Sequence, residues 1–574
     1  MKRGLLALCA LLLLLAVTPV ASAAPRKDSD TFVQLLAIND FHGNLQPPSG
    51  SSGRISVAPG ATVDAGGVEY LATWIKSLRT ANTNTITIGA GDLIGASPLI
   101  SGLFHDEPAI EAMNAIGLDV SGVGNHEFDE GVNELLRMRY GNQVGGDGCH
   151  PVDGCQDGTP YFGSIFEYLA ANVFYSGTNT TIFPPYEVRK VDNAKIAFIG
   201  LTLEGTPLIV TPAGVAGLEF RPEISTINTL VRQLRATQGI RAFVVLIHQG
   251  GQQNAPFPLG YMDSDRCDNF TGDIKPIVEA LDPQVDVVVS AHTHQPYVCR
   301  FNGILTTSAS SFGRLVTDID LRIDHQTKDI ETATAHNVIV TRGVAKDATE
   351  TAIISKYDAL SGPLAHRIVG SITADITRAA NAAQESALGD VIADAQLAST
   401  SRTDFGGAVV AFMNPGGIRA DFTYANSDAG EAPGQITYNE VFTVQPFNNV
   451  MTVKTMTGDM LYRLLEQQFD NPSAGALRFL QVSNGFNYTW DSTKPHGQHI
   501  VPNSMTINGA QVDPAASYRV AMNNFLATGG DGFSVFNEGS DPLGGEIDID
   551  ALVNYFLTHS PVAPGPQNRI TRVP

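Results

Sequence analysis

The amino-acid sequence predicts a mixed α/β protein built from two parts. Between residues 31 and 340, short and nearly continuous apolar runs alternate with helix-like stretches, which is typical of sheets covered by helices. A second α/β part begins near His366, after a helical stretch at residues 351–360 and the pair Gly362-Pro363. We therefore expect a first domain at residues 30–340, a linker helix at 345–363 and a smaller second domain at 364–574.

Composition limits what such a protein binds. Hydrophobic residues make up 43% of the 574 residues, enough for a large core, which excludes a wholly disordered chain. With 36 Lys and Arg against 58 Asp and Glu, the formal net charge is -22, so the chain would repel the phosphates of a nucleic-acid polymer. An anionic substrate would need a local positive centre, such as metal ions or well-placed arginines.

The first 23 residues have the pattern of a secretory signal peptide. A basic start, Met1-Lys2-Arg3, precedes an apolar run from Leu5 to Val17 and an Ala-x-Ala site that ends at Ala23. The alternative is a membrane anchor, but the run is too short to cross a hydrocarbon core of about 30 Å. No later segment is long and apolar enough for a membrane span. We expect cleavage near Ala23 and a secreted or periplasmic protein.

Four cysteines remain once Cys9 leaves with the signal peptide: Cys149, Cys155, Cys267 and Cys299. Four cysteines allow three pairings. Because export permits disulfides, we favour the two local pairs, Cys149–Cys155 and Cys267–Cys299. Four free thiols are the alternative.

In the first part, six apolar runs are predicted as strands: residues 32–38, 85–88, 120–123, 195–199, 242–247 and 285–289. Five of them lead directly into side chains that can bind metal ions, whereas the run that ends at Gly200 does not. These side chains are Asp40, His42, Asp92, Asn125, His248, His292 and His294. Because an α/β sheet gathers the carboxyl ends of its strands at one edge, where ligands bind, we expect the side chains to lie close together.

Each of these residues alone has a simpler interpretation, since an Asp or Asn after a strand usually caps a turn and a single His is usually structural. Their joint order favours a metal site. A mixed shell of oxygen and nitrogen ligands suits Zn, Mn, Co, Fe or Ni rather than Ca. Seven ligands exceed the needs of one tetrahedral ion, so they predict two ions about 3.5–4 Å apart that share a carboxylate, as in phosphatases.

The order of the motifs resembles that of the calcineurin-like metallophosphoesterases: Asp-x-His, Gly-Asp, Gly-Asn-His-Glu, a strand-end His and His-x-His. With the longer match Gly-Asn-His-Glu-Phe-Asp at 124–129 and the second part, nearly the whole mature chain resembles the secreted 5′-nucleotidase family. The resemblance implies a four-layer α/β/β/α sandwich for the first domain and a smaller α/β substrate-binding domain for the second.

The resemblance also implies a role for each ligand. It places the first ion on Asp40, His42 and His294, the second on Asn125, His248 and His292, and Asp92 as a bridge between them. The two divalent ions would be Zn, Mn or Co. Two positions depart from the family: His294 stands where several relatives carry Asn or Gln, and Ala291 replaces a common Gly.

His126 and Asp129 resemble the catalytic dyad of the family. The residues support this independently, because positions i and i+3 at the start of a helix lie close enough to interact. Asp129 would orient the imidazole and favour its positive charge. His126 would then stabilise negative charge on the phosphoryl group and the leaving oxygen.

Three segments of the second part resemble the family's substrate-binding segments: Asn414-Pro415-Gly416-Gly417-Ile418-Arg419, Pro446-Phe447, and residues 524–532. The resemblance implies that Phe447 and Phe525 hold a nucleobase between their rings and that Asp531 accepts hydrogen bonds from ribose hydroxyls. It implies substrate contacts for Asn414, Arg419 and Arg378, although Arg378 stands farther from Glu385 than in the best-known relatives. Taken singly, a Phe is usually a core residue and Gly-Gly-Asp-Gly an ordinary turn.

These observations predict an exported hydrolase with two divalent metal ions that releases phosphate from nucleoside 5′-monophosphates by attack of metal-activated water. Nucleoside di- and triphosphates and UDP-sugars are further candidate substrates. The alternatives are a 2′,3′-cyclic-nucleotide 2′-phosphodiesterase/3′-nucleotidase, a thiosulfohydrolase, and a non-catalytic secreted nucleotide-binding protein. Phe447, Phe525 and Asp531 argue against a sulfur substrate, which has no base to stack. We expect a monomer or weak dimer.

Overall fold

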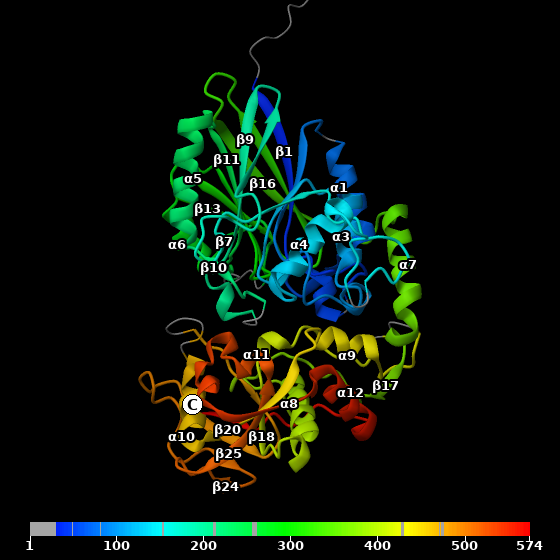
Figure 1. Cartoon of the computed structure of the whole chain (residues 1–574), viewed down its shortest axis with the longest axis vertical. Coiled ribbons are helices and arrows are strands. Elements are labelled where there is room, and N and C mark those ends of the chain that lie inside the picture. The colour runs from blue at the N-terminus through cyan, green and yellow to red at the C-terminus, as the bar shows by residue number, and fades with distance from the viewer. Residues whose placement is uncertain are drawn as a thin grey trace, which may run out of the picture.

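The computed structural model describes residues 30–573, apart from residues 49, 81, 152–153, 211–213, 255–260, 426, 428–429, 470 and 472–475. The predicted signal peptide, residues 1–23 with Cys9, lies outside the described residues. Every helix among the described residues is too short or too polar to span a lipid bilayer. The chain forms two parts stacked along the long axis, with helix α7 along one side (Figure 1).

The first part contains two six-stranded sheets, each with four parallel strands. One sheet has the order β16-β15-β1-β4-β5-β6, with bounds Ile330–Ile339, Leu315–Ile323, Thr31–Ile38, Thr85–Ala90, Val120–Gly122 and Glu167–Leu169. The other has the order β13-β14-β12-β11-β9-β8, with bounds Pro296–Phe301, Ile304–Ala309, Val287–Ser290, Ala242–His248, Ala194–Thr202 and Tyr186–Val191. The antiparallel strands are β15 and β16 at one edge of the first sheet, and β13 and β8 at the two edges of the second.

The two sheets pack face to face, and helices cover their outer faces. Val33 and Leu35 of β1 share one buried cluster with Phe198 and Val244 of the other sheet. The alternate residue Leu36 instead joins the cluster beneath the helices α1 (Val68–Arg79) and α3 (Glu107–Ile116). On the opposite side, α5 (Glu223–Gln238) and α6 (Ile274–Glu279) cover the second sheet. The result confirms the predicted four-layer sandwich, and burial on both faces explains why the strands read as continuous apolar runs.

Smaller elements complete the first part. They are α2 (Leu99–Gly102), α4 (Val132–Tyr140), the pair β2 (Arg54–Ala58) and β3 (Ala61–Asp64), and the pair β7 (Val173–Tyr175) and β10 (Leu218–Phe220). Two disulfides cross-link this part: Cys149–Cys155 within one loop, with Cα atoms 5.3 Å apart, and Cys267–Cys299, which joins a loop to the buried strand β13, at 5.1 Å. The favoured local pairing is therefore confirmed.

Helix α7 (Ala348–Ala365) occupies the region predicted as a linker. The Asp347 side chain caps it by accepting hydrogen bonds from the backbone N–H groups of Thr349 and Glu350. Lys356 on this helix pairs with Glu111 of α3 at 2.9 Å, so α7 is fastened to the first part before the chain enters the second. The helix continues through Pro363, although proline lacks the backbone N–H that would donate to the preceding turn.

The second part is built on a five-stranded sheet of order β21-β18-β25-β20-β26. The bounds are Gln481–Val482, Val410–Met413, Ser517–Asn523, Val450–Thr457 and Ser540–Ile547. Its other strands are β17 (Ile368–Ser371), β19 (Gln435–Thr437), β22 (Phe486–Asp491), β23 (Thr506–Ile507), β24 (Ala510–Gln511) and β27 (Ile570–Val573). Its helices are α8 (Ala387–Thr400), α9 (Tyr438–Val444), α10 (Gly458–Glu466), α11 (Asn524–Ala527) and α12 (Asp548–His559). Helices α8 and α12 pack over one core cluster, and α10 over another.

Candidate active site

The predicted metal ligands meet where the parallel strands of both sheets end. In the first sheet Ile38 aligns with Gly89, and Ala90 aligns with Gly122. In the second sheet Ile247 aligns with Ser290. Because these strands end level with one another, the loops that follow them project from the same edge. The loops carry Asp40, His42, Asp92, Asn125, His292 and His294, and His248 ends its strand.

The backbone at this edge adopts an unusual conformation. Five of the seven ligand candidates have a positive φ: Asp40 (49°), His42 (48°), Asp92 (49°), His292 (71°) and His294 (56°). Non-glycine residues rarely adopt this left-handed region, and such strain of about 1–3 kcal/mol per residue gathers at functional sites. The folded protein therefore holds these side chains in place at a cost to its stability.

Asp40, His42 and His294 form one group, with ligand atoms all within 4.8 Å of one another. Nε2 of His42 lies 3.1 Å from Nε2 of His294, which in turn lies 3.4 Å from Oδ1 of Asp40. Nδ1 of His42 lies 2.7 Å from the backbone carbonyl of Gly95. A carbonyl only accepts, so Nδ1 carries the proton and the lone pair of Nε2 faces the group. Such a second contact commonly orients a metal-bound His.

Asp92, His248 and His292 form a second group of the same size. The carbonyl of Ala90 fixes His248 in the same way, 2.9 Å from its Nδ1. Nε2 of His248 then lies 2.9 Å from Oδ2 of Asp92 and has no hydrogen-bond partner. Oδ1 of Asn125 lies 3.0 Å from Nδ1 of His292. A buried imidazole nitrogen and a carboxylate oxygen at this distance need a proton or a cation between them, and the nitrogen and oxygen donors gathered here fit a divalent ion.

Asp92 lies between the two groups. Its Oδ2 is 3.6 Å from Nε2 of His42 and 2.9 Å from Nε2 of His248, one from each group. Asp40 and Asp92 are almost fully buried. Burial opposes their ionisation, but the surrounding histidines hold the pKa of Asp92 well below its usual value and lower that of Asp40. The carboxylates therefore stay negative, which suits a site for cations.

His126 and Asp129 form a hydrogen-bonded pair beside these groups, with Nδ1 of His126 2.8 Å from Oδ2 of Asp129. His126 opens the short helix η2 (His126–Phe128), and its backbone N–H donates to Oδ1 of Asp92 at 2.9 Å. Burial lowers the pKa of His126, but the charges of Asp129 and Asp92 outweigh it and raise the pKa above its usual value. The imidazole therefore carries a positive charge more readily than a free His does.

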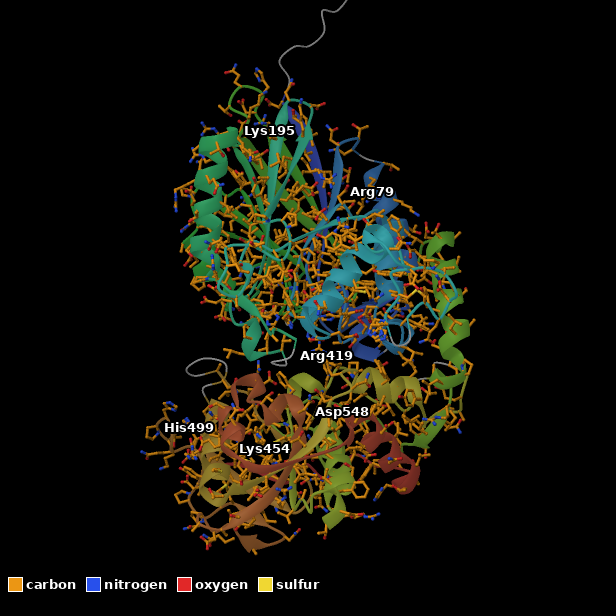
Figure 2. All side chains as sticks on the ribbon, in the orientation of Figure 1. Arg79, Lys195, Arg419, Lys454, His499 and Asp548 are labelled. Carbon is orange, nitrogen blue, oxygen red and sulfur yellow. A yellow bond between two sulfur atoms is a disulfide. The ribbon has the colours of Figure 1, made fainter. Side chains whose placement is uncertain are left out.

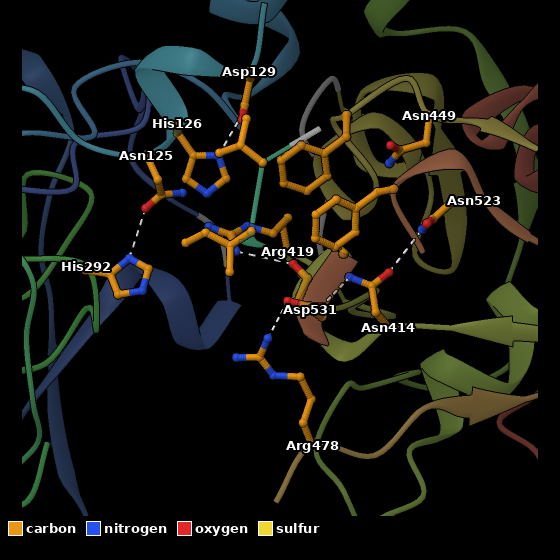
Figure 3. A pocket seen from close by; sticks show the side chains of 16 residues that line it. Asn125, His126, Asp129, His292, Asn414, Arg419, Asn449, Arg478, Asn523 and Asp531 are labelled. Carbon is orange, nitrogen blue, oxygen red and sulfur yellow. Dashed lines mark hydrogen bonds and ion pairs between the residues drawn. The ribbon is translucent and has the colours of Figure 1, made fainter. Parts of the chain in front are cut away.

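A cavity of about 280 Å³ joins this edge of the first part to the second part (Figure 3). From the first part it is lined by Asn125, His126, Asp129, Ile209, Val210 and His292. From the second it is lined by Asn414, Gly416, Gly417, Arg419, Phe447, Asn449, Arg478, Asn523, Phe525 and Asp531. Residues predicted to bind metal, perform catalysis and bind substrate thus meet in one space.

Arg419 and Phe447 place the second part against the predicted dyad. The ring of Phe447 stacks on that of His126, with centroids 5.7 Å apart and an angle of 22°. The guanidinium of Arg419 lies 5.8 Å from the centroid of Phe447, at the boundary between the two parts (Figure 2). Burial and the charge of Arg378 lower the pKa of Arg419. A poorly solvated cation of this kind attracts an anionic group strongly.

Arg378 does not line this cavity. Its Nη1 donates to the backbone carbonyl of Arg419 at 2.5 Å, and its Nη2 donates to the hydroxyl of Ser52 at 3.2 Å. Arg378 therefore supports the loop that carries Arg419 and contacts the first part. A direct role in substrate binding stays a prediction.

Two family models match the chain. One, described as calcineurin-like phosphoesterase, covers residues 33–296, and the other, the 5′-nucleotidase C-terminal domain, covers residues 368–538. Cell wall protein Lmo0130 of Listeria monocytogenes is 31% identical over 570 residues, which cover 94% of this chain and 68% of that protein. The chain belongs to the 5′-nucleotidase family.

Other proteins resemble the chain over different shares of their length. Endonuclease YhcR of Bacillus subtilis is 31% identical over 544 residues, 94% of this chain, but the chain spans only 41% of that protein. The crystal structure of a 5′-nucleotidase precursor from Thermus thermophilus has a TM-score of 0.75 and 24% identity. It covers 95% of this chain and 99% of its own, and it shares the two-part fold.

Two residues of this family member join the site without a motif that predicted their roles. Glu127 is buried and accepts backbone hydrogen bonds from Asp92, Leu93 and Gly124 at 2.7–2.9 Å, so it ties two ligand loops together. Arg478 pairs with Oδ1 of Asp531. Glu127 belongs to the Gly-Asn-His-Glu motif, so the sequence contained a signal for its role. Arg478 and Asp531 are 53 residues apart, and no local pattern in the sequence predicts that they pair.

Asp531 belongs to a hydrogen-bonded network on the cavity wall (Figure 3). The amide of Asn414 donates to its Oδ2 at 2.9 Å, and the amide of Asn523 donates to Oδ1 of Asn414 at 3.0 Å. With Arg478 on its other oxygen, the carboxylate is held in one orientation. A carboxylate oxygen accepts more than one hydrogen bond, so Asp531 retains capacity for a hydroxyl donor in the cavity.

Proposed function

We propose that this chain is an exported, divalent-metal-dependent 5′-nucleotidase that releases phosphate from nucleoside 5′-monophosphates. The observation that carries the proposal is the shared cavity between the two parts. On one side it is lined by the candidate ligands Asn125 and His292 and by the His126/Asp129 pair, and on the other by aromatic rings and Asp531. The proposal includes domain boundaries at residues 30–340 and 364–574 with a linker helix at 345–363. It also includes a signal peptide cleaved near Ala23 and a monomer or weak dimer.

The ligand groups are proposed to hold two ions, Zn, Mn or Co. The first would bind Asp40, His42 and His294, the second Asn125, His248 and His292, with Asp92 shared. When bound, the ions would neutralise phosphate charge and make water a stronger nucleophile near neutral pH. Support comes from the position of Asp92 between the groups and from the orientation of His42 and His248 by backbone carbonyls.

His126 is proposed to assist departure of the nucleoside oxygen. Asp129 accepts a hydrogen bond from Nδ1 of His126. The other ring nitrogen, Nε2, remains available in this ring, which lines the cavity. A protonated imidazole donates from Nε2 to the oxygen on which charge develops. Arg419 is placed to balance the charge of the phosphoryl group from the side of the second part.

Substrate recognition is proposed to lie in the second part. Phe447 and Phe525 are half-buried and line the cavity, so each presents ring surface to a nucleobase. Asp531 would accept hydrogen bonds from the ribose hydroxyls, and Asn414 would keep the Asp531 carboxylate in position. Such a site receives one nucleotide, and the net charge of -22 disfavours a polymer. Nucleoside di- and triphosphates and UDP-sugars are candidates of the same kind.

The test uses the purified mature chain, residues 24–574, freed of metal with a chelator and reloaded with Mn²⁺ or Zn²⁺. Phosphate release would be measured with AMP, ADP, UDP-glucose, 3′-AMP and 2′,3′-cyclic AMP. We expect metal-restored release from AMP. Activity confined to 3′-AMP and the cyclic nucleotide would favour the 3′-nucleotidase alternative and overturn the 5′ assignment. Silence on every substrate with metal bound would overturn the enzyme proposal.

A further inference from the structure

Three side chains outside the active site gather at the surface of the first part: His105, Glu130 and His150. Their nearest ligand atoms lie within 4.8 Å of one another. Nδ1 of His105 is 2.7 Å from Oε2 of Glu130, and the rings of His105 and His150 stack with centroids 3.6 Å apart. They come from three separate segments: the turn after α2, the residue after Asp129, and the loop closed by the Cys149–Cys155 disulfide.

Arg137 on α4 connects the three segments. It pairs with Glu107, two residues after His105, and with Glu134, four residues after Glu130, each at 2.6 Å. Its Nη1 also donates at 2.8 Å to the carbonyl of Gly148, two residues before His150. One largely buried guanidinium thus holds the backbone near each of the three side chains, so their gathering is built into the fold.

The turn that presents His105 is also fixed. His105 and Asp106 both have positive φ values, 51° and 60°. The buried carboxylate of Asp106 accepts from the backbone N–H of Gly95 at 2.9 Å and from the hydroxyl of Ser101 at 2.6 Å. On the other side of the cluster, the six-residue separation of the disulfide keeps His150 in a small covalent ring. Both imidazoles therefore sit on constrained backbone.

The chemistry of the cluster suits a transition-metal ion. Neutral imidazole is a common ligand of such ions. Two His and one Glu form the protein ligand set of open zinc sites, where water completes the shell. The Glu130 side chain is 48% exposed and that of His105 is 18% exposed, so solvent reaches the cluster. The similar group of Asp30, Asp324 and His325 differs, because the Arg322 guanidinium already lies 3.4 Å from Asp30.

We propose that His105, Glu130 and His150 bind an additional divalent transition-metal ion, with Zn²⁺ the preferred one. This ion would link the turn after α2, the segment after η2 and the disulfide-closed loop. Glu130 directly follows Asp129, and a cavity lined by His105, Asp129, Glu130 and Phe447 extends from the cluster toward the predicted dyad. The site would therefore brace the wall behind that dyad without belonging to the active site.

The test is a zinc count on the mature protein. Wild type, His105→Ala, His150→Ala and His336→Ala would be equilibrated with Zn²⁺, passed through gel filtration and analysed by atomic emission. His336 is the matched control, since it is an exposed His that also pairs with a carboxylate, that of Asp265. We expect His105→Ala and His150→Ala each to bind one zinc ion fewer per chain than wild type and His336→Ala. Release of phosphate from AMP should change less than threefold.

Equal zinc content in wild type and in folded His105→Ala and His150→Ala proteins would overturn the proposal. Circular dichroism would establish that the variants fold. If they do not, crystals of wild type soaked in Zn²⁺ decide the question without a variant, because anomalous scattering at the zinc edge locates the ion. A peak between His105, Glu130 and His150 is expected, and the absence of one would refute the site. Neither readout depends on nucleotidase activity, so failure of the proposed function would be seen separately.

Discussion

Replacing Asp129 by Asn tests the proposed dyad directly, because it removes a charge and keeps the size of the side chain. The carboxylate lies 2.8 Å from Nδ1 of His126, and the two side chains are 26% and 15% exposed. A hydrogen bond to a charged group contributes about 1.5–3 kcal/mol, and partial exposure places this one toward the lower end. A loss of about 1.5–2 kcal/mol in the transition state lowers kcat roughly 10–30-fold.

The assay is steady-state phosphate release from AMP by metal-loaded protein, with metal content measured on the same samples. Because Asp129 acts through His126, Asp129→Asn should lower kcat with little change in KM or in bound metal, and His126→Ala should lower kcat further. Asp265→Asn is the matched control, since it alters a surface pair with His336 and should leave kcat unchanged. A kcat for Asp129→Asn within twofold of wild type would refute the dyad, and so would a loss explained by missing metal.

Two further predictions address the nucleobase and the effect of pH on stability. Phe525→Ala should lower kcat/KM for AMP about 5–150-fold, the value of stacking on one ring, and leave ribose 5-phosphate unaffected; equal losses on both substrates would contradict the clamp. Burial raises the pKa of Asp286 from 3.8 to about 8, although the N–H of Phe243 donates to it at 2.9 Å. The folded state therefore binds the proton more tightly, so this carboxyl costs stability as pH rises from about 4 to about 8, by at most about 1.4 kcal/mol per pH unit. Asp286→Asn should gain Tm over wild type progressively between pH 5 and pH 8, and a gain independent of pH in thermal unfolding would contradict this reasoning.

The sheet edge that carries the seven candidate metal ligands, here called the metal edge, was predictable because each ligand follows its strand closely in the sequence. A short apolar run followed by Asp, Asn or His can be recognised in the sequence without knowledge of distant segments. Parallel strands then bring such ends together at one edge of the sheet. The same logic excluded the strand that ends at Gly200, which carries no ligand. The four-layer architecture followed from the family resemblance, and the two disulfides followed from the preference for pairing cysteines that are neighbours in the sequence.

Other parts of the site depend on contacts between distant segments, and no pattern announced them. Arg478 reaches Asp531 from another segment of the second part, and Arg137 gathers segments that bear His105, Glu130 and His150 through contacts with residues beside them. For Arg378, the sequence suggested a role that its contacts in the structure do not reproduce. Its position in the sequence suggested substrate contact, yet its guanidinium is engaged by the backbone of the Arg419 loop.

The left-handed backbone at the metal edge limits which residues can stand there. Apart from Gly, the residues that enter this region most readily are Asn, Asp and His, which are also suitable metal ligands. At positions such as His294, with φ 56°, exchange among these three residues alters the donor atom while the loop keeps its path. Single substitutions among these residues can therefore change the metal preference and leave the backbone fold intact. A β-branched residue at the same position would strain the backbone and distort the loop.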